Sequence, residues 1–139
     1  SIDGILMGRN TFNVVQGFDK WPYNKPVFIL SNKLREIDKK YFGKATIVHG
    51  NIKTIIEGLE RSGIKKLYVD GGKTIQSFLN EDLIDEMTIT TIPILLGNGI
   101  RLFDFIKVEL SFEITKSEVL SKDMVKIHYK RRNRTIAST

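Results

Sequence analysis

The chain has 139 residues, 41% of them hydrophobic and 27% charged, a composition typical of a single soluble globular domain with a sizeable core. It has no cysteine, which excludes disulfides and zinc–thiolate sites and fits a cytoplasmic protein, and the spacing of its two histidines, His49 and His128, predicts no metal site. Its apolar runs are too short to cross a membrane, and its net charge of +6 would suit a polyanionic ligand.

Short apolar runs and helical patterns alternate along the first half of the chain. Residues 5–7 predict a buried strand, and a helix from Arg9 to about Gln16 follows it. Residues 17–25, which include Trp21 and Tyr23, predict a loop whose aromatic residues either line a cleft or pack on the loop itself. Two further buried strands are predicted at residues 26–30 and 45–48.

A second helix is predicted after these strands. Asn51 is a suitable N-cap and Gly63 a suitable stop signal. Apolar residues at helical spacing mark one face of this helix, and they are Ile52, Ile55, Ile56 and Leu59.

The most informative segment, residues 67–79, reads as a strand, a double-glycine turn and a helix. A helix that opens on glycines presents free N–H donors and the positive end of its dipole, which together favour a phosphate group. Gly72, Lys73 and Thr74 resemble the end of a P-loop, but that motif requires a glycine where this chain has Leu67. The sequence therefore predicts a phosphate-binding turn of another kind.

The last third has a different pattern. A strand is predicted at residues 87–94, followed by a loop that ends near Phe103. Apolar and polar residues then alternate at 108–115 and at 125–130, on either side of a polar turn at 121–123, and this pattern predicts an antiparallel hairpin. We therefore expect an α/β protein with a mixed sheet, helices on both faces and a C-terminal hairpin.

Polar or glycine-bearing stretches follow three of the predicted strands. In open α/β sheets, ligands bind outside the carboxyl ends of the strands, so these stretches would face one crevice if the strands are parallel. Their glycines, hydroxyls and cationic side chains suit a phosphorylated ligand such as a dinucleotide. The three stretches are residues 8–11, 31–33 and 70–74.

The same segments resemble the dihydrofolate reductase-like fold, and in particular the C-terminal reductase domain of the bifunctional riboflavin-biosynthesis deaminase-reductase. Residues 7–12 are similar to a Gly-Arg-x-Thr segment beside the NADPH phosphates, and residues 93–103 are similar to a stretch typical of the riboflavin-type branch. The resemblance implies one reductase domain over residues 1–139, with three α/β/α layers and a mixed, mostly parallel sheet.

The resemblance also implies a reaction and residue roles. The reaction would be hydride transfer from NADPH to a pyrimidine- or pterin-like substrate, as in 5-amino-6-(5-phosphoribosylamino)uracil reductase. Substrate contacts would be Asp70 and Thr90, although Asp70 also reads as a turn residue and Thr90 as an ordinary strand residue. The cofactor would be bound by Gly8, Arg9, Thr11, Ser31, Asn32, Lys33, Gly71, Gly72, Lys73 and Thr74.

Two alternatives stay open, a true dihydrofolate reductase and a non-catalytic nucleotide-binding or regulatory domain of the same fold. The family's first strand and substrate loop, which carry the catalytic carboxylate in dihydrofolate reductases, would precede Ile2, so no catalytic residue is assigned. Homodimers occur in the family, and the apolar edge of the hairpin would be one place for such a contact. Residues 131–139 are expected to form a basic, frayed tail, and nucleic-acid binding is not expected because no aromatic residue follows Tyr129.

Overall fold

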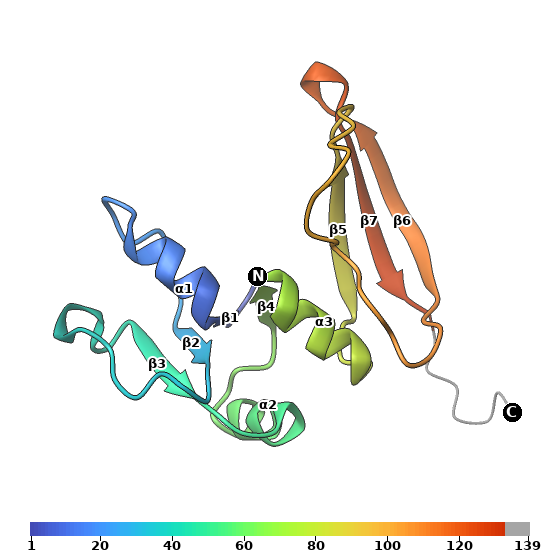
Figure 1. Cartoon of the computed structure of the whole chain (residues 1–139). Helices are drawn as coiled ribbons and strands as arrows, with labels where there is room; N and C mark the ends of the chain where they lie inside the picture. Colours follow the sequence, from blue (N-terminus) through green and yellow to red (C-terminus); the bar gives the residue numbers. More distant parts are fainter. Residues whose placement is uncertain (133–139) are drawn as a thin grey trace, which may run out of the picture. The chain divides into compact units, whose positions relative to one another are not determined.

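The computed structural model describes residues 1–132, in which two compact units are present (Figure 1). The first unit comprises Ser1–Ser77 and the second begins at Phe78. Helix α3, Gly72–Asn80, starts in the first unit and ends in the second. None of the helices in residues 1–132 is long and apolar enough to cross a membrane.

The first unit is built on a four-stranded parallel sheet with the order β3-β2-β1-β4. Strand β1, Gly4–Gly8, has a neighbour on each side, and Leu6 and Met7 within it are fully buried. This explains why the predicted strand at 5–7 is a continuous apolar run. The other strands are β2, Val27–Leu30, β3, Ala45–Val48, and β4, Leu67–Asp70.

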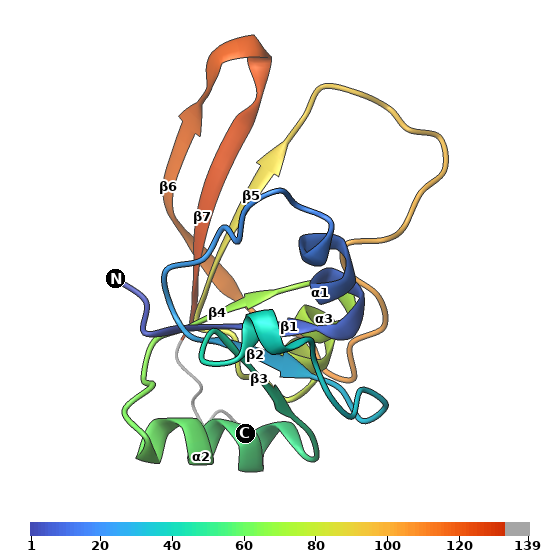
Figure 2. The ribbon, with the colours of Figure 1, turned by 90° about the vertical axis from the view of Figure 1, so that its left-hand side faces the viewer.

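Helices cover both faces of this sheet. Figure 2 shows α1, Arg9–Gln16, and α2, Ile52–Arg61, on opposite sides of it. Asn51 caps α2 as predicted, because its Oδ1 accepts a hydrogen bond of 2.9 Å from the Lys53 N–H. Gly63, just beyond the helix, has a φ of +94°, a conformation that favours glycine.

Aromatic packing closes one side of the core. The ring of Phe12 lies 5.5 Å from that of Tyr41, which belongs to a short 3₁₀ helix, η1, Lys39–Tyr41. The Trp21 ring lies 5.2 Å from Tyr41 and 5.3 Å from Tyr23. Trp21 therefore packs on Tyr23 of its own loop, as one of the two alternatives for residues 17–25 predicts, and also on the core through Tyr41.

The second unit contains an antiparallel sheet with the order β5-β7-β6. Its strands are β5, Glu86–Thr91, β6, Phe112–Val119, and β7, Val125–Arg131. The α/β class and the C-terminal antiparallel hairpin that the sequence predicts are thus confirmed, with the parallel strands in the sheet of the first unit and the antiparallel strands in the sheet of the second. The predicted polar turn corresponds to η2, Ser121–Asp123, in which Lys122 has a φ of +66°.

Two strand boundaries were wrong in the sequence prediction. Strand β5 ends at Thr91 instead of residue 94, because Pro93 cannot donate to a ladder and the Ile94 N–H turns back to the Ile92 carbonyl at 2.8 Å. Strand β6 begins at Phe112 instead of Val108. An irregularity between Ile114 and Lys116 shifts its register by one residue, so the simple alternation does not continue across it.

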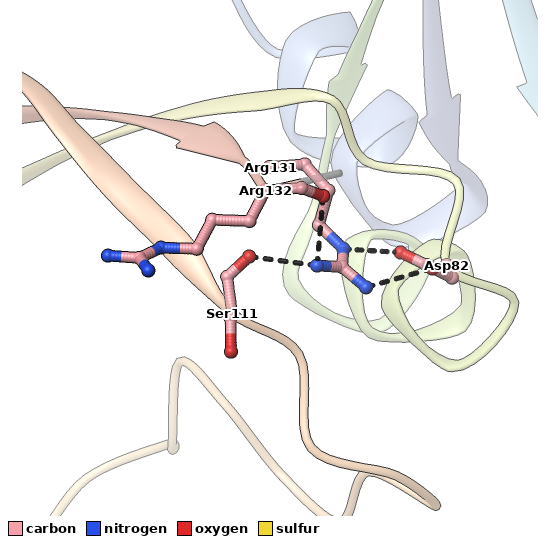
Figure 3. Close-up of polar contacts among 4 residues, drawn as sticks. All are labelled: Asp82, Ser111, Arg131 and Arg132. Atoms are coloured by element: carbon pink, nitrogen blue, oxygen red, sulfur yellow. Dashed lines mark hydrogen bonds and ion pairs between the residues drawn. The ribbon is translucent and has the colours of Figure 1, made fainter. Parts of the chain in front are cut away.

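The predicted basic tail begins inside β7. Arg131 forms a two-pronged ion pair with Asp82, with Nε–Oδ1 and Nη2–Oδ2 distances of 2.8 and 3.1 Å, and its Nη1 donates to the Ser111 carbonyl at 2.9 Å (Figure 3). The Arg131 guanidinium is therefore part of the packing of the second unit. Residues 133–139 of the predicted tail lie outside the described residues.

Candidate functional site

The carboxyl ends of three neighbouring strands form the candidate site. Strands β2, β1 and β4 are adjacent and parallel, with Gly8 opposite Leu30 and Met7 opposite Asp70. Since neighbouring strands lie about 4.8 Å apart, the three ends span roughly 10 Å. The structure therefore brings the three predicted cofactor segments, at residues 8–11, 31–33 and 70–74, to one edge of the first unit.

Two glycines allow the chain to pack closely at this edge. A Cβ atom on Gly8 would lie 2.7 Å from Thr74 Oγ1, and a Cβ on Gly71 would lie 2.6 Å from Thr11 Oγ1. Gly71 also has a φ of +101°, which L-residues rarely adopt. The turns after β1 and β4 therefore interlock through the hydroxyls of two threonines, of which Thr74 is buried at 7% exposure.

The interlocked turns place the starts of two helices beside each other. Helix α1 begins after Gly8, which has no side chain to cap it, and α3 begins at Gly72. Neither helix has an acidic residue in its first turn. The first turns themselves therefore hold no carboxylate that would neutralise their N–H groups and positive dipole ends, although Asp70 precedes α3 by two residues. Such helix starts favour a bound anion.

The end of β2 has a defined turn. The Ser31 Oγ accepts hydrogen bonds from the backbone N–H groups of Lys33, at 3.2 Å, and Leu34, at 3.0 Å. Asn32 Oδ1 accepts from the Gly50 N–H at 3.2 Å and so ties this turn to the loop after β3. Both predicted contact residues, Ser31 and Asn32, therefore shape the turn, whereas Lys33 is exposed and can meet a ligand.

Three exposed cations surround these turns. They are Arg9 at the start of α1, Lys33 after β2, and Lys73 in the first turn of α3. A Cβ atom on Gly72 would have no neighbour within 4 Å, so the backbone there is open to an approaching group. The phosphates of a dinucleotide would suit this edge, because it combines accessible glycine backbone, two helix starts without acidic residues in their first turns, and three cationic side chains.

Asp70 lies beside aromatic residues. Because side chains alternate along a strand, Asp70 and Tyr68 of β4 point to the same face of the sheet, and Tyr68 is 53% exposed. Burial, followed by the nearby negative charge of Asp70 and then Tyr68, raises the pKa of Tyr23. Tyr68 was not singled out in the sequence, although its two-residue spacing from Asp70 is the signal that places the two residues together.

The remaining predicted residue, Thr90, belongs to the second unit. It is exposed on β5, opposite Lys126 of β7, and its contact with a substrate stays a prediction. A concavity of about 260 Å³ on the same sheet is lined in part by Thr88, Lys116 and His128. Its volume is below the 300 Å³ or so that small-molecule sites usually have, and none of the predicted site residues lines it.

Comparison with known proteins is consistent with this geometry. The model of the RibD C-terminal domain family matches residues 1–126. The uncharacterised protein YyaP of Bacillus subtilis is 26% identical over 142 residues, which cover 92% of this chain and 73% of YyaP.

Solved structures show the same fold. A putative riboflavin biosynthesis protein from Shewanella sp. PV-4 is 49% identical with a TM-score of 0.91, over 95% of this chain and 75% of that chain. Acinetobacter baumannii RibD is 17% identical with a TM-score of 0.72, over 94% of this chain and 47% of that protein. The chain therefore has the dihydrofolate reductase-like α/β fold of these reductase-domain proteins.

Proposed function

Because this chain belongs to the RibD C-terminal domain family, we propose that it is an NADPH-dependent reductase acting on a pyrimidine- or pterin-like substrate. The family is a reductase domain of riboflavin biosynthesis, which supports reduction as the type of reaction. The cofactor and the substrate are our proposals for this chain. One observation carries the cofactor assignment, namely the two adjacent helix starts without acidic residues at the ends of β1 and β4.

In this proposal each part of the site has a separate task. NADPH supplies the hydride when it is bound. The open backbone at Gly72 and the first turns of α1 and α3 receive the pyrophosphate, while Arg9 and Lys73 contribute positive charge. Lys33, exposed at the end of β2, meets the additional phosphate that distinguishes NADPH from NADH.

Asp70 is proposed to contact the substrate. A carboxylate can accept two N–H groups from an amino-substituted heterocycle, and the half-exposed ring of Tyr68 offers an apolar surface on the same face of β4. No proton donor is assigned, because the described residues place no further acid at the carboxyl ends of β1 and β2.

The test is a fluorescence titration of the chain with NADPH and NADH. We expect NADPH to bind more tightly, and Lys33→Gln to remove most of this preference without unfolding the chain. Lys65→Gln is the matched control, because Lys65 is also exposed but precedes β4 and therefore lies at the opposite end of the strands. Equal affinity for both cofactors in the unmodified chain would contradict the assignment of Lys33.

Turnover separates catalysis from binding alone. With 5-amino-6-(5-phosphoribosylamino)uracil present, a reductase consumes NADPH as it reduces the ribosyl group, and the loss of absorbance at the nicotinamide wavelength reports the rate. Asp70→Asn should raise the KM for this substrate while leaving the dissociation constant of NADPH unchanged. A chain that binds NADPH but reduces neither pyrimidine nor pterin compounds would instead support the regulatory alternative.

A further inference from the structure

His49 lies at the carboxyl end of β3, beside the strand end that carries Lys33. Leu30, the last residue of β2, is opposite Val48, the last residue of β3, so His49 follows its strand at the level at which Ser31 follows β2. Neighbouring strands are about 4.8 Å apart. His49 is therefore next to the turn proposed to meet the additional phosphate of NADPH, although it belongs to none of the three polar stretches predicted from the sequence.

Two hydrogen bonds fix the backbone on either side of His49. On one side, the Ser31 N–H donates to the Val48 carbonyl at 3.0 Å. On the other side, the Gly50 N–H donates to Asn32 Oδ1 at 3.2 Å. Both chain neighbours of His49 are thus tied to the turn after β2, and all of these residues belong to the first unit. The position of His49 beside this turn therefore does not depend on the second unit.

No acidic residue lies near His49 or Lys33 in the sequence. The chain has no Asp or Glu in residues 20–35 or in residues 39–56. Helix α2, which begins shortly after His49, has no acidic residue in its first turn. A Cβ atom on Gly50 would meet no atom within 4 Å, so the backbone beside His49 is open to an approaching group. Neither segment therefore offers a carboxylate that would repel an anion.

The two side chains are available as donors. Both Lys33 and His49 are exposed, and within residues 1–132 neither side chain takes part in a hydrogen bond or an ion pair. A phosphate monoester carries a charge of about −1.5 to −2 and three strong acceptor oxygens. It can accept from an ammonium group and from an imidazole N–H at the same time, whereas the hydroxyl that replaces it in NADH is uncharged and has a single oxygen.

We infer that His49 is a specificity-determining residue of the proposed cofactor site, where it binds, together with Lys33, the phosphate that NADPH carries and NADH lacks. The inference rests on the proposed function, because it requires the cofactor to lie along the carboxyl ends of the parallel strands. It adds the end of β3 to the three strand ends already described.

Fluorescence titrations with both cofactors test this role. His49→Gln should weaken NADPH binding by about 5- to 10-fold, in the range of a single hydrogen bond, and should leave the dissociation constant of NADH unchanged. Unchanged NADH binding would show that the turn keeps its position. Combined with Lys33→Gln, the substitution should make the two cofactors bind equally. Lys44→Gln is the matched control, because Lys44 is also exposed but precedes β3 and lies at the opposite end of that strand, so the preference for NADPH should persist.

Proton NMR reports the contact directly. The chain has two histidines, so the ring signal of His49 is identified by its loss in His49→Gln. The probes are adenosine 2′,5′-bisphosphate and adenosine 5′-monophosphate, which differ by the 2′-phosphate alone. The His49 signal should shift when the bisphosphate is added and not when the monophosphate is added, a difference that a purely structural role of His49 would not produce.

The outcomes separate this inference from the proposed function. If NADPH binds more tightly than NADH but His49→Gln leaves the ratio of the two dissociation constants unchanged, the role of His49 is wrong and the proposed function stands. Equal shifts of the His49 signal with both probes would overturn the inference in the same way. If the unmodified chain binds neither cofactor, the proposed function fails and the inference fails with it.

Discussion

Replacing Gly71 with alanine tests the close packing on which the candidate site depends. The new Cβ would lie 2.6 Å from Thr11 Oγ1, closer than real Cβ contacts, and the backbone would retain a φ of +101°. Forcing an L-residue into this conformation costs about 1–3 kcal/mol, and the overpacking adds about 1–3 kcal/mol. We therefore expect Gly71→Ala to lower the free energy of unfolding by about 2–6 kcal/mol, a large share of the roughly 5–15 kcal/mol that domains have.

Urea denaturation followed by circular dichroism measures this loss, and the neighbouring glycine is the control. Gly72 has an ordinary φ, and a Cβ added there would meet no atom within 4 Å, so Gly72→Ala should change the free energy of unfolding by less than about 1 kcal/mol. In a Thr11→Ala background the steric part of the Gly71→Ala loss should disappear, while the backbone strain remains. A loss below about 0.5 kcal/mol for Gly71→Ala, or an equal loss for Gly72→Ala, would refute the reasoning.

The remaining predictions concern the second unit, the chain start and the cofactor. Arg131→Gln should lower the free energy of unfolding by about 1–3 kcal/mol in urea denaturation, because the Arg131 side chain is only 11% exposed, whereas exposed Arg132→Gln should cost under about 0.5 kcal/mol. The N–H groups of Lys66 and Lys65 hold the pKa of Asp3 below its ordinary 3.8, so its contribution to stability is present above that value and lost as the pH falls through the folded pKa. The melting temperature of Asp3→Asn should accordingly fall less below about pH 4 than that of the unmodified chain. If the melting temperatures of both chains depend on pH in the same way, Asp3 does not have this role. Gly72→Ala, although folded, should weaken NADPH binding measurably by titration, since its Cβ would fill space proposed for a phosphate.

The local features of the first unit were predictable from the sequence. The Asn51 cap, the glycine stop at Gly63 and the strand–turn–helix at 67–79 each depend on residues close together in the chain. The sequence also predicted that the three polar stretches lie at one edge of the sheet. Parallel strands joined by helices place their carboxyl ends on the same side.

Features that depend on contacts between distant residues were not predictable. The fit of Gly8 against Thr74 joins segments more than sixty residues apart, and no local pattern encodes it. The irregularity between Ile114 and Lys116 interrupts the side-chain alternation that the hairpin prediction used. The alternation at residues 108–111 also did not show that β6 begins only at Phe112. Likewise, the sequence alone places Arg131 in a basic tail. Its ion pair with Asp82, a residue distant in sequence, appears only in the structure.

The site residues divide by burial into two groups with different expected phenotypes. Gly8, Thr11, Gly71 and Thr74 fill the contact between two turns, so substitutions there act first on stability and affect binding through the position of the helix starts. The exposed cations Arg9, Lys33 and Lys73 take part in no described packing contact, so their substitution should change affinity with little effect on the free energy of unfolding. If a substitution lowers both the free energy of unfolding and the affinity for the ligand, the residue therefore shapes the two turns of the site. A variant in which only affinity falls identifies a ligand contact, and on this basis measurement of both quantities for the same variants distinguishes a true cofactor site from a turn that merely needs glycine.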